Sequence, residues 1–155
     1  MSRDQLVTDW VASRFPNQSV SITPASADAS FRRYFRLTWP DGETRILMDA
    51  PPEKEDCKPF IHVAGLLAKA DLAAPRILDK DLDNGFLVLT DLGRIGYLDA
   101  LNADLSLADT LIRPVLDTLV KWQQASSAAT LPPYDGHLLR RELDLFPEWF
   151  IGRHL

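Results

Sequence analysis

The sequence predicts an α+β fold, and three observations support this prediction. Residues typical of β-strands dominate the stretch from Ser19 to Asp49 and two short runs further on, near 76–79 and 86–90. Apolar residues recur at helical spacing before, between and after these strands. No strand signal remains beyond Gly93. We therefore expect a five-stranded antiparallel sheet with helices, followed by a purely helical segment.

The first predicted element is a helix at the start of the chain. Ser2 followed three residues later by Gln5 is a capping-box pattern. Behind it, apolar residues recur at helical spacing: Leu6, Val7, Trp10 and Val11. The pattern ends at Phe15 and Pro16.

Three strands are predicted next, at residues 19–25, 31–39 and 44–49. The last two are joined by a segment with Pro40 in the second turn position and Gly42 in the fourth. This spacing predicts a type I turn closed by a left-handed glycine. If Trp39 pairs with Glu43 across the turn, alternate residues of the two strands meet on one side of the sheet. The expected pairs are Leu37 with Arg45, Phe35 with Leu47, and Arg33 with Asp49.

A second helix and two more strands complete the predicted sheet region. Asp56 can cap a helix that runs to about Ala70. Its apolar stripe consists of Phe60, Val63, Ala64 and Leu67. The strands near 76–79 and 86–90 are joined across residues 82–85, which read Leu-Asp-Asn-Gly.

Only helices are expected after Gly93. Residues 106–124 are amphipathic, with Pro114 as a predicted kink. A linker rich in Ser, Ala and Pro follows at 126–133, and a further helix begins near Gly136. No break signal precedes the last residue, so we expect the chain to be part of a longer protein.

Composition narrows the class of protein. A chain of 155 residues that is 46% hydrophobic and 25% charged can bury a core. The net charge of −5 argues against a general nucleic-acid binder, because neutralising phosphates requires a basic surface. The apolar runs are too short for a membrane span, and the first 16 residues lack the order of a signal peptide. A single cysteine excludes an internal disulfide framework and suits a reducing compartment. Taken together, these features lead us to expect a cytoplasmic protein without membrane or nucleic-acid partners.

Specific segments carry a resemblance to a known family. They are residues 26–36 (SADASFRRYFR), 48–52 (MDAPP), 87–93 (LVLTDLG), 141–143 (REL) and 145–150 (LFPEWF). In that order they resemble the aminoglycoside phosphotransferase family. Within it, they are similar to bacterial kinases that phosphorylate the anomeric hydroxyl of N-acetylmuramate and N-acetylglucosamine.

The resemblance implies a protein-kinase-like architecture. Residues 1–93 would form the nucleotide-binding small lobe including its hinge, and 94–155 would begin a helical lobe that the chain leaves incomplete. The implied reaction is ATP-dependent phosphorylation of a sugar hydroxyl. The family's catalytic Asp and its Mg²⁺ ligands belong to motifs that the chain lacks. We therefore expect no catalytic or metal-binding residue here, and no turnover by the 155 residues alone.

The resemblance also assigns a nucleotide site. The tip of the first hairpin would cover the ATP phosphates, which requires small residues so that backbone N–H groups can approach. Asp28, Ala29 and Ser30 fall at this tip, although the segment contains no glycine. Leu89 would lie at the back of the adenine pocket, with the Thr90 carbonyl and the Leu92 amide facing the base. Without the family, the same residues indicate an ordinary polar turn and a strand end.

The cation that steadies the phosphates needs a separate hypothesis. Kinases usually place a lysine on the third strand and a glutamate on the next helix. In this sequence the third predicted strand, 44–49, contains no lysine, and the helix from Cys57 to Ala70 contains no glutamate. The predicted pairing brings Arg33 and Asp49 together on a mainly apolar face, with Leu47 as part of the roof over adenine. One interpretation is that Arg33 holds the phosphates and Asp49 orients it. The other is a plain cross-strand ion pair, and a slip of one residue would turn Arg32 and Arg36 inward instead.

Candidates for substrate binding lie near the end of the chain. Arg141, Glu142 and Trp149 fall where the family's sugar pocket begins, and Trp149 could stack on a sugar face. Without the family, the residues themselves favour helix packing and a solvated surface. For the whole protein, the alternative to an ATP-dependent sugar kinase is a kinase-fold module that binds nucleotide or protein without catalysis.

Overall fold

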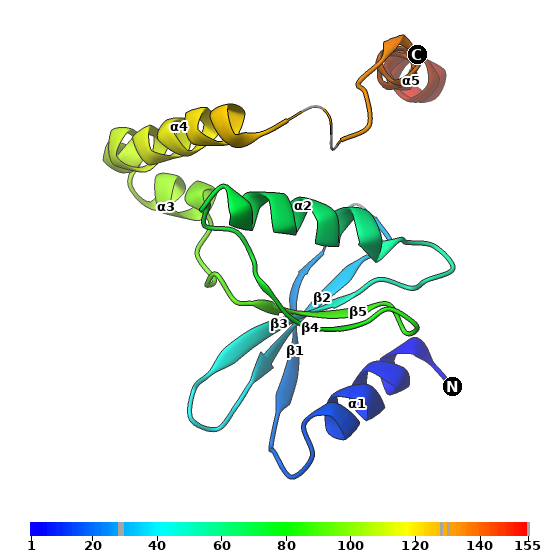
Figure 1. Ribbon diagram of the computed structural model, residues 1–155. Coiled ribbons are helices and arrows are strands. Elements are labelled where there is room, and N and C mark those ends of the chain that lie inside the picture. Colours follow the sequence, from blue (N-terminus) through cyan, green and yellow to red (C-terminus); the bar gives the residue numbers. More distant parts are fainter. Residues whose placement is uncertain (28–29, 128, 130, 155) are drawn as a thin grey trace. The chain divides into compact units, whose positions relative to one another are not determined.

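The computed structural model describes residues 1–27, 30–127, 129 and 131–154. Its strands are β1 (Ser21–Ala27), β2 (Arg33–Thr38), β3 (Thr44–Asp49), β4 (Ile77–Asp81) and β5 (Phe86–Thr90). Its helices are α1 (Arg3–Arg14), α2 (Cys57–Lys69), α3 (Tyr97–Ala103), η1 (Leu105–Leu107), α4 (Ala108–Ala125), α5 (Gly136–Leu145), η3 (Phe146–Ile151) and α6 (Gly152–His154). The predicted α+β class is confirmed (Figure 1). The short elements α3 and η1 were not predicted.

The five strands form one antiparallel sheet in the order β1-β2-β3-β5-β4. The predicted register of β2 and β3 is confirmed, because Arg33 is paired with Asp49 and Phe35 with Leu47. The turn between them is responsible: the Trp39 N–H donates to Glu43 O at 2.9 Å, and Gly42 has a φ of +90°. That backbone conformation is open to glycine and rare for other residues.

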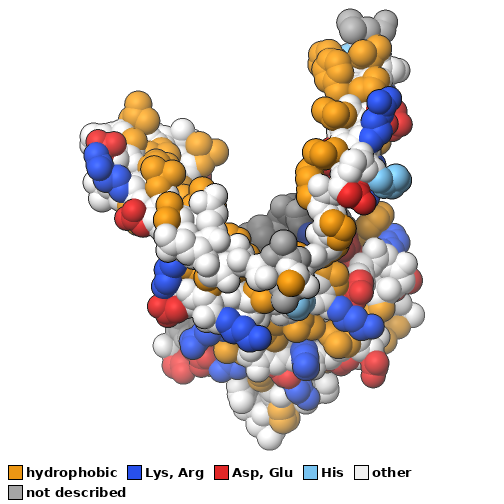
Figure 2. Space-filling view, turned by 45° about the horizontal axis from the view of Figure 1, so that its top comes forward, with side chains coloured by type: hydrophobic (Ala, Val, Ile, Leu, Met, Phe, Trp, Pro, Cys, Tyr) orange, Lys and Arg blue, Asp and Glu red, His pale blue; other side chains and the backbone are white. Residues whose placement is uncertain are grey.

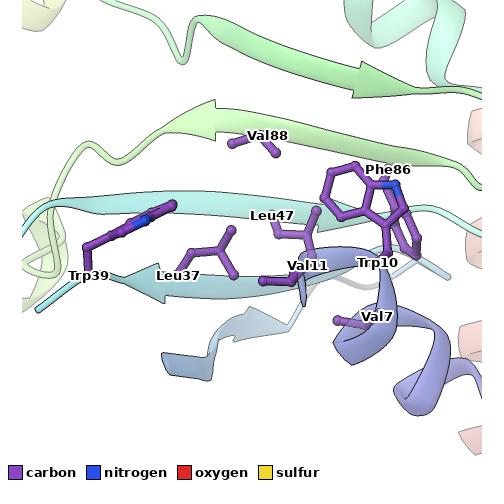
Figure 3. Packing of buried hydrophobic residues seen from close by; sticks show 8 residues of the cluster. All are labelled: Val7, Trp10, Val11, Leu37, Trp39, Leu47, Phe86 and Val88. Carbon is purple, nitrogen blue, oxygen red and sulfur yellow. The ribbon is translucent and has the colours of Figure 1, made fainter. Parts of the chain in front are cut away.

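Helix α1 covers one face of the sheet. The Ser2 hydroxyl accepts a hydrogen bond from the Gln5 N–H at 3.2 Å, as the capping pattern predicts. A core cluster forms between α1 and the sheet: Val7, Trp10, Val11, Leu37, Trp39, Leu47, Phe86 and Val88 (Figure 3). The Trp10 and Phe86 rings lie 5.0 Å apart between centroids. Figure 1 shows α1 on the side of the sheet opposite to α2.

Helix α2 covers the other face, and Asp56 caps it by accepting from the Lys58 N–H at 2.8 Å. The buried residues on this face are Met48, Ala50, Cys57, Leu87 and Leu89. Tyr34, Ile46, Phe60, Ile61 and Ile77 pack against them. Both faces of the central strands are therefore apolar, so hydrophobic pattern alone does not distinguish the two faces.

The chain divides into two compact units, Met1–Gln124 and Ala125–Leu155. This division does not coincide with the lobe boundary predicted after Gly93, which stays a prediction about the family's lobes. Hydrophobic side chains gather on the helices that follow the sheet (Figure 2). Exposed examples are Val115, Leu116, Leu119 and Val120 in α4, and Phe146, Trp149 and Phe150 in η3. Within the described residues, no helix is both long and apolar enough to cross a membrane.

Candidate functional site

A hollow of about 700 Å³ lies on the α2 side of the sheet. Its lining comes from β1, β2, β3, α2 and the segment that follows β5. The residues are Pro24, Ala25, Ser26, Tyr34, Arg36, Ile46, Phe60, Pro75, Leu89, Thr90, Asp91, Leu92, Gly93, Arg94, Ile95 and Gly96. This volume is large enough for a drug-sized ligand.

The apolar wall of the hollow follows from strand pairing. Ile46 in β3 is paired with Arg36 on one side and with Leu89 in β5 on the other. Paired residues point to the same face of a sheet, so all three side chains face α2. Phe60 from α2 and Pro75 from the loop before β4 add further apolar surface. The wall can accept a flat, largely apolar ring.

A buried ion pair forms the polar part of the wall. Arg36 Nε donates to Asp91 Oδ2 at 2.5 Å and Nη2 donates to Oδ1 at 3.0 Å. The side chains of Arg36 and Asp91 are only 8% and 6% exposed. Hydrogen bonding from the Arg36 guanidinium lowers the pKa of Asp91 to about 2, and the Asp91 partner raises the pKa of Arg36.

The same pair holds the backbone that leaves β5. Arg36 Nη2 also donates to the Gly93 carbonyl at 2.8 Å, and the Gly93 N–H donates to Asp91 Oδ1 at 2.9 Å. Gly93 has a φ of +105°, which suits only glycine. At the strand end, the Thr90 N–H donates to Arg76 O, and the Arg76 N–H donates to Thr90 Oγ1, both at 2.9 Å. The segment 90–93 is therefore anchored at both of its ends.

Three predicted nucleotide-binding residues lie at this hollow: Leu89, Thr90 and Leu92. Ser30 is outside its lining, and its hydroxyl accepts from the Arg32 N–H at 3.1 Å and from Arg32 Nε at 3.2 Å. Asp28 and Ala29 lie outside the described residues, so their predicted role at the hairpin tip stays a prediction.

The structure does not bring Arg33, Leu47 and Asp49 to the hollow. They lie on the α1 face, where Leu47 is fully buried in the core beneath α1. The predicted pair exists, since Arg33 Nε and Nη2 donate to Asp49 Oδ2 at 2.9 and 2.6 Å. Arg3 of α1 completes it by donating to Asp49 Oδ1 from Nε at 2.8 Å and from Nη2 at 2.6 Å. The hypothesis that Arg33 holds phosphates thus loses its geometric basis, because the opposite face of the sheet lines the hollow.

The sequence interpretation did not name Asp91, Ile46 or Tyr34 as site residues, and it placed Arg36 inward only if the register slipped by one residue. The signal that could have found them is strand alternation. Leu89, which was placed in the pocket, is paired with Ile46, whereas Leu47 is paired with Val88. Leu47 and Leu89 therefore cannot share one pocket, and choosing Leu89 selects Arg36 as the inward arginine.

The predicted substrate residues lie in the second compact unit. Arg141 Nη2 donates to Glu142 Oε1 at 3.1 Å on α5, and both side chains are exposed. Trp149 in η3 is 55% exposed. The Arg153 Cζ atom lies over its ring, 4.1 Å from the centroid of the Trp149 ring. Nothing in this unit tests their role, which stays a prediction. In the described part of the chain, no three His, Cys, Asp or Glu side chains are grouped as metal ligands would be.

Comparisons with known proteins point to one family. Residues 21–155 match the model of the phosphotransferase enzyme family. The chain is 49% identical to an N-acetylmuramate/N-acetylglucosamine kinase of Pseudomonas aeruginosa, over 99% of the chain and 48% of that protein. Relatives of the same name in Pseudomonas putida and Neisseria meningitidis are 52% and 38% identical, over 87% and 100% of the chain and 39% and 46% of their own lengths. The chain thus spans less than half the length of these relatives.

Proposed function

The chain belongs to the phosphotransferase enzyme family, and from this premise we propose that it supplies the nucleotide-binding part of an ATP-dependent sugar kinase. One observation carries the proposal: in the hollow between the sheet and α2, the apolar wall lies next to the anchored segment 90–93. Apolar walls for a ring, next to backbone groups for its polar edge, are what an adenine site requires. Residues 87–93 also resemble the family segment that forms the hinge between the two lobes, where adenine pairs with the backbone.

The lining residues suit ATP in distinct ways. Ile46 and Leu89 would contact the faces of the base, and Phe60 would close the slot from α2. The Thr90 carbonyl and the Leu92 N–H are the acceptor and donor proposed for its edge. Leu92 as a residue is 67% exposed, and it lies in the lining of the hollow. Asp28, Ala29 and Ser30 remain the residues proposed to cover the phosphates.

The usual strand lysine has no counterpart on the hollow's face of β3. Met48 occupies the inward position next to Ile46 and is fully buried. We propose that Mg²⁺, held by family motifs that this chain does not match, supplies the charge that stabilises the transferred phosphoryl group. For the same reason, phosphoryl transfer by the 155 residues alone is not expected.

The proposed acceptor is an amino sugar. Three relatives carry the name N-acetylmuramate/N-acetylglucosamine kinase, at 38% to 52% identity. The anomeric hydroxyl is the proposed acceptor group, and Arg141, Glu142 and Trp149 are the proposed contacts to the sugar. Tryptophan offers a flat apolar face and an N–H donor, which suits a pyranose ring.

The test uses the whole protein that contains this chain, with ATP and either sugar, and detects a sugar 1-phosphate by phosphorus NMR. We expect both sugars to be phosphorylated, and Ile46→Trp to raise the KM for ATP at least about 10-fold by filling the slot, with the sugar KM unchanged. Val63→Trp, on the exposed side of α2, is the matched control. Nucleotide binding without turnover of any acceptor would favour a non-catalytic module instead.

A further inference from the structure

We propose that Arg36 and Asp91 are positioning residues that set the purine selectivity of the nucleotide site. The inference rests on the proposed function, because it assumes that a purine base meets the segment 90–93. The proposed function assigns contacts with the base to the backbone of segment 90–93. The further inference is that two charged side chains fix the position of that backbone. Neither side chain needs to touch the nucleotide for this role.

The geometry singles out Leu92. Both backbone polar groups of Gly93 are held, its N–H by Asp91 and its carbonyl by Arg36, at 2.9 and 2.8 Å. Thr90, on the other side, is held by Arg76. Leu92 as a whole is 67% exposed, so packing does little to fix this residue. The position of the Leu92 N–H is therefore set through the ion pair.

Burial makes the ion pair a rigid support. The two side chains make two hydrogen bonds in a bidentate arrangement, and almost no solvent reaches them. A charge-assisted bidentate pair defines orientation as well as distance. Arg36 also starts from β2, two strands away from β5, and crosses beside Ile46 to reach Asp91. The hinge is thus braced against the middle of the sheet.

Purine selectivity follows from this placement. The edge of adenine presents an N–H donor and a ring-nitrogen acceptor, whereas guanine presents a carbonyl acceptor and a ring N–H donor. A fixed carbonyl at Thr90 and a fixed N–H at Leu92 match the donor and the acceptor of adenine. With guanine, the Thr90 carbonyl would face another acceptor and the Leu92 N–H would face another donor. Sites that are built to pair hydrogen bonds discriminate strongly only while the partners stay in register. A loosened hinge would tolerate guanine better.

The experiment compares ATP with GTP in the whole protein. For Arg36→Met and Asp91→Asn we expect the ratio of kcat/KM for ATP to that for GTP to fall at least about 10-fold, mainly through KM. The KM for the sugar should stay within about 2-fold. Arg36→Lys should not restore the ratio, because an ammonium cannot hold Asp91 and Gly93 in the same bidentate fork.

The other arginine of β2 provides a matched control. Arg33→Met also removes a buried-carboxylate partner from the same strand, but on the α1 face, and it should leave the ATP-to-GTP ratio unchanged. Amide hydrogen exchange gives a second readout that does not depend on activity. Exchange in the peptide that contains residues 90–95 should accelerate in Asp91→Asn and remain as in wild type in Arg33→Met.

The outcomes separate this inference from the proposed function. If the wild-type protein uses no nucleotide, the proposed function fails, and this inference fails with it. If ATP is used and the hinge variants lower all kinetic constants with an unchanged ATP-to-GTP ratio, the pair has only a structural role and this inference alone is overturned. If Arg36→Met does not fold, Asp91→Asn and the exchange measurement still decide the question.

Discussion

Two arginines of the same strand, β2, each pair with an aspartate, and the two pairs have different structural roles. Arg33 and Arg36 are three residues apart, so their side chains leave opposite faces of the sheet. Arg33 meets Asp49 on the neighbouring strand, beneath α1. Arg36 meets Asp91 beyond the end of β5, beside the hollow. Identical chemistry therefore joins a helix to the sheet on one face and braces a loop on the other.

The number of partners separates the two pairs further. Asp49 is fully buried and accepts from both Arg3 and Arg33, so α1 and β2 are held through one carboxylate. Asp91 has one arginine, and its remaining hydrogen bonds include one from the backbone N–H of Gly93. The first pair links two elements of the fold. The second fixes the course of a short exposed segment, and function rather than stability should depend on it most.

The largest effect on stability is expected for Asp49→Ala. The change leaves two guanidinium groups near a buried site without their carboxylate, and should lower the free energy of unfolding by about 3–5 kcal/mol. Urea denaturation of the variant and wild type measures this. Asp4→Ala, which removes a 78% exposed partner of Arg33, should cost no more than about 1 kcal/mol. An equal loss of unfolding free energy in the two variants would mean that Asp49 does not hold α1 and β2 together.

Two core leucines test whether the faces differ in function. Leu47→Ala and Leu89→Ala should each lower the free energy of unfolding by about 2–5 kcal/mol, because both side chains are buried. Only Leu89 lines the hollow, so only Leu89→Ala should raise the KM for ATP. The measurement is the ATP dependence of sugar phosphorylation at a temperature where both variants are folded. A matching rise in Leu47→Ala would remove the functional distinction between the faces.

Acid should weaken the hinge pair within a defined pH range. The pKa of Asp91 lies at about 2 in the folded chain, below its ordinary value of 3.8. The stabilisation is therefore present above about pH 4 and is lost as the pH falls towards 2, a change of about 2 kcal/mol. Denaturation across this range should show a shallower slope for Asp91→Asn than for wild type. Asp79 and Asp81, whose pKa values are also lowered, keep part of the slope in both proteins.

The smallest effect is expected for Arg33→Ala. Asp49 keeps Arg3 as a partner, and the Arg33 side chain is 40% exposed, so the cost should be about 1 kcal/mol. The kcat/KM for ATP should stay within about 2-fold of wild type, because Arg33 lies away from the hollow. A loss on the order of 100-fold would restore the hypothesis that Arg33 holds phosphates. Steady-state kinetics of the whole protein decides between them.

Local rules in the sequence predicted the strands well but not the use of each face. The turn at Pro40–Gly42 fixes the pairing of β2 and β3, so the contact between Arg33 and Asp49 could be foreseen. Which face lines the hollow depends on where α1 and α2 pack, and strand residues on both faces are apolar. Arg36–Asp91 was missed because its partners are 55 residues apart and belong to no common turn.

The place of β5 in the sheet has a consequence for synthesis of the chain. β5 is made last but lies between β3 and β4, so the hydrogen-bonding edge of β3 stays open until Thr90 has left the ribosome. The 41 residues that follow Asp49, up to and including Thr90, take about 2–8 s to translate at 5–20 residues per second. During that interval Trp10 also lacks Phe86. The nascent chain therefore presents an unpaired strand edge and an apolar helix face that is only partly covered, which is the kind of surface that chaperones recognise.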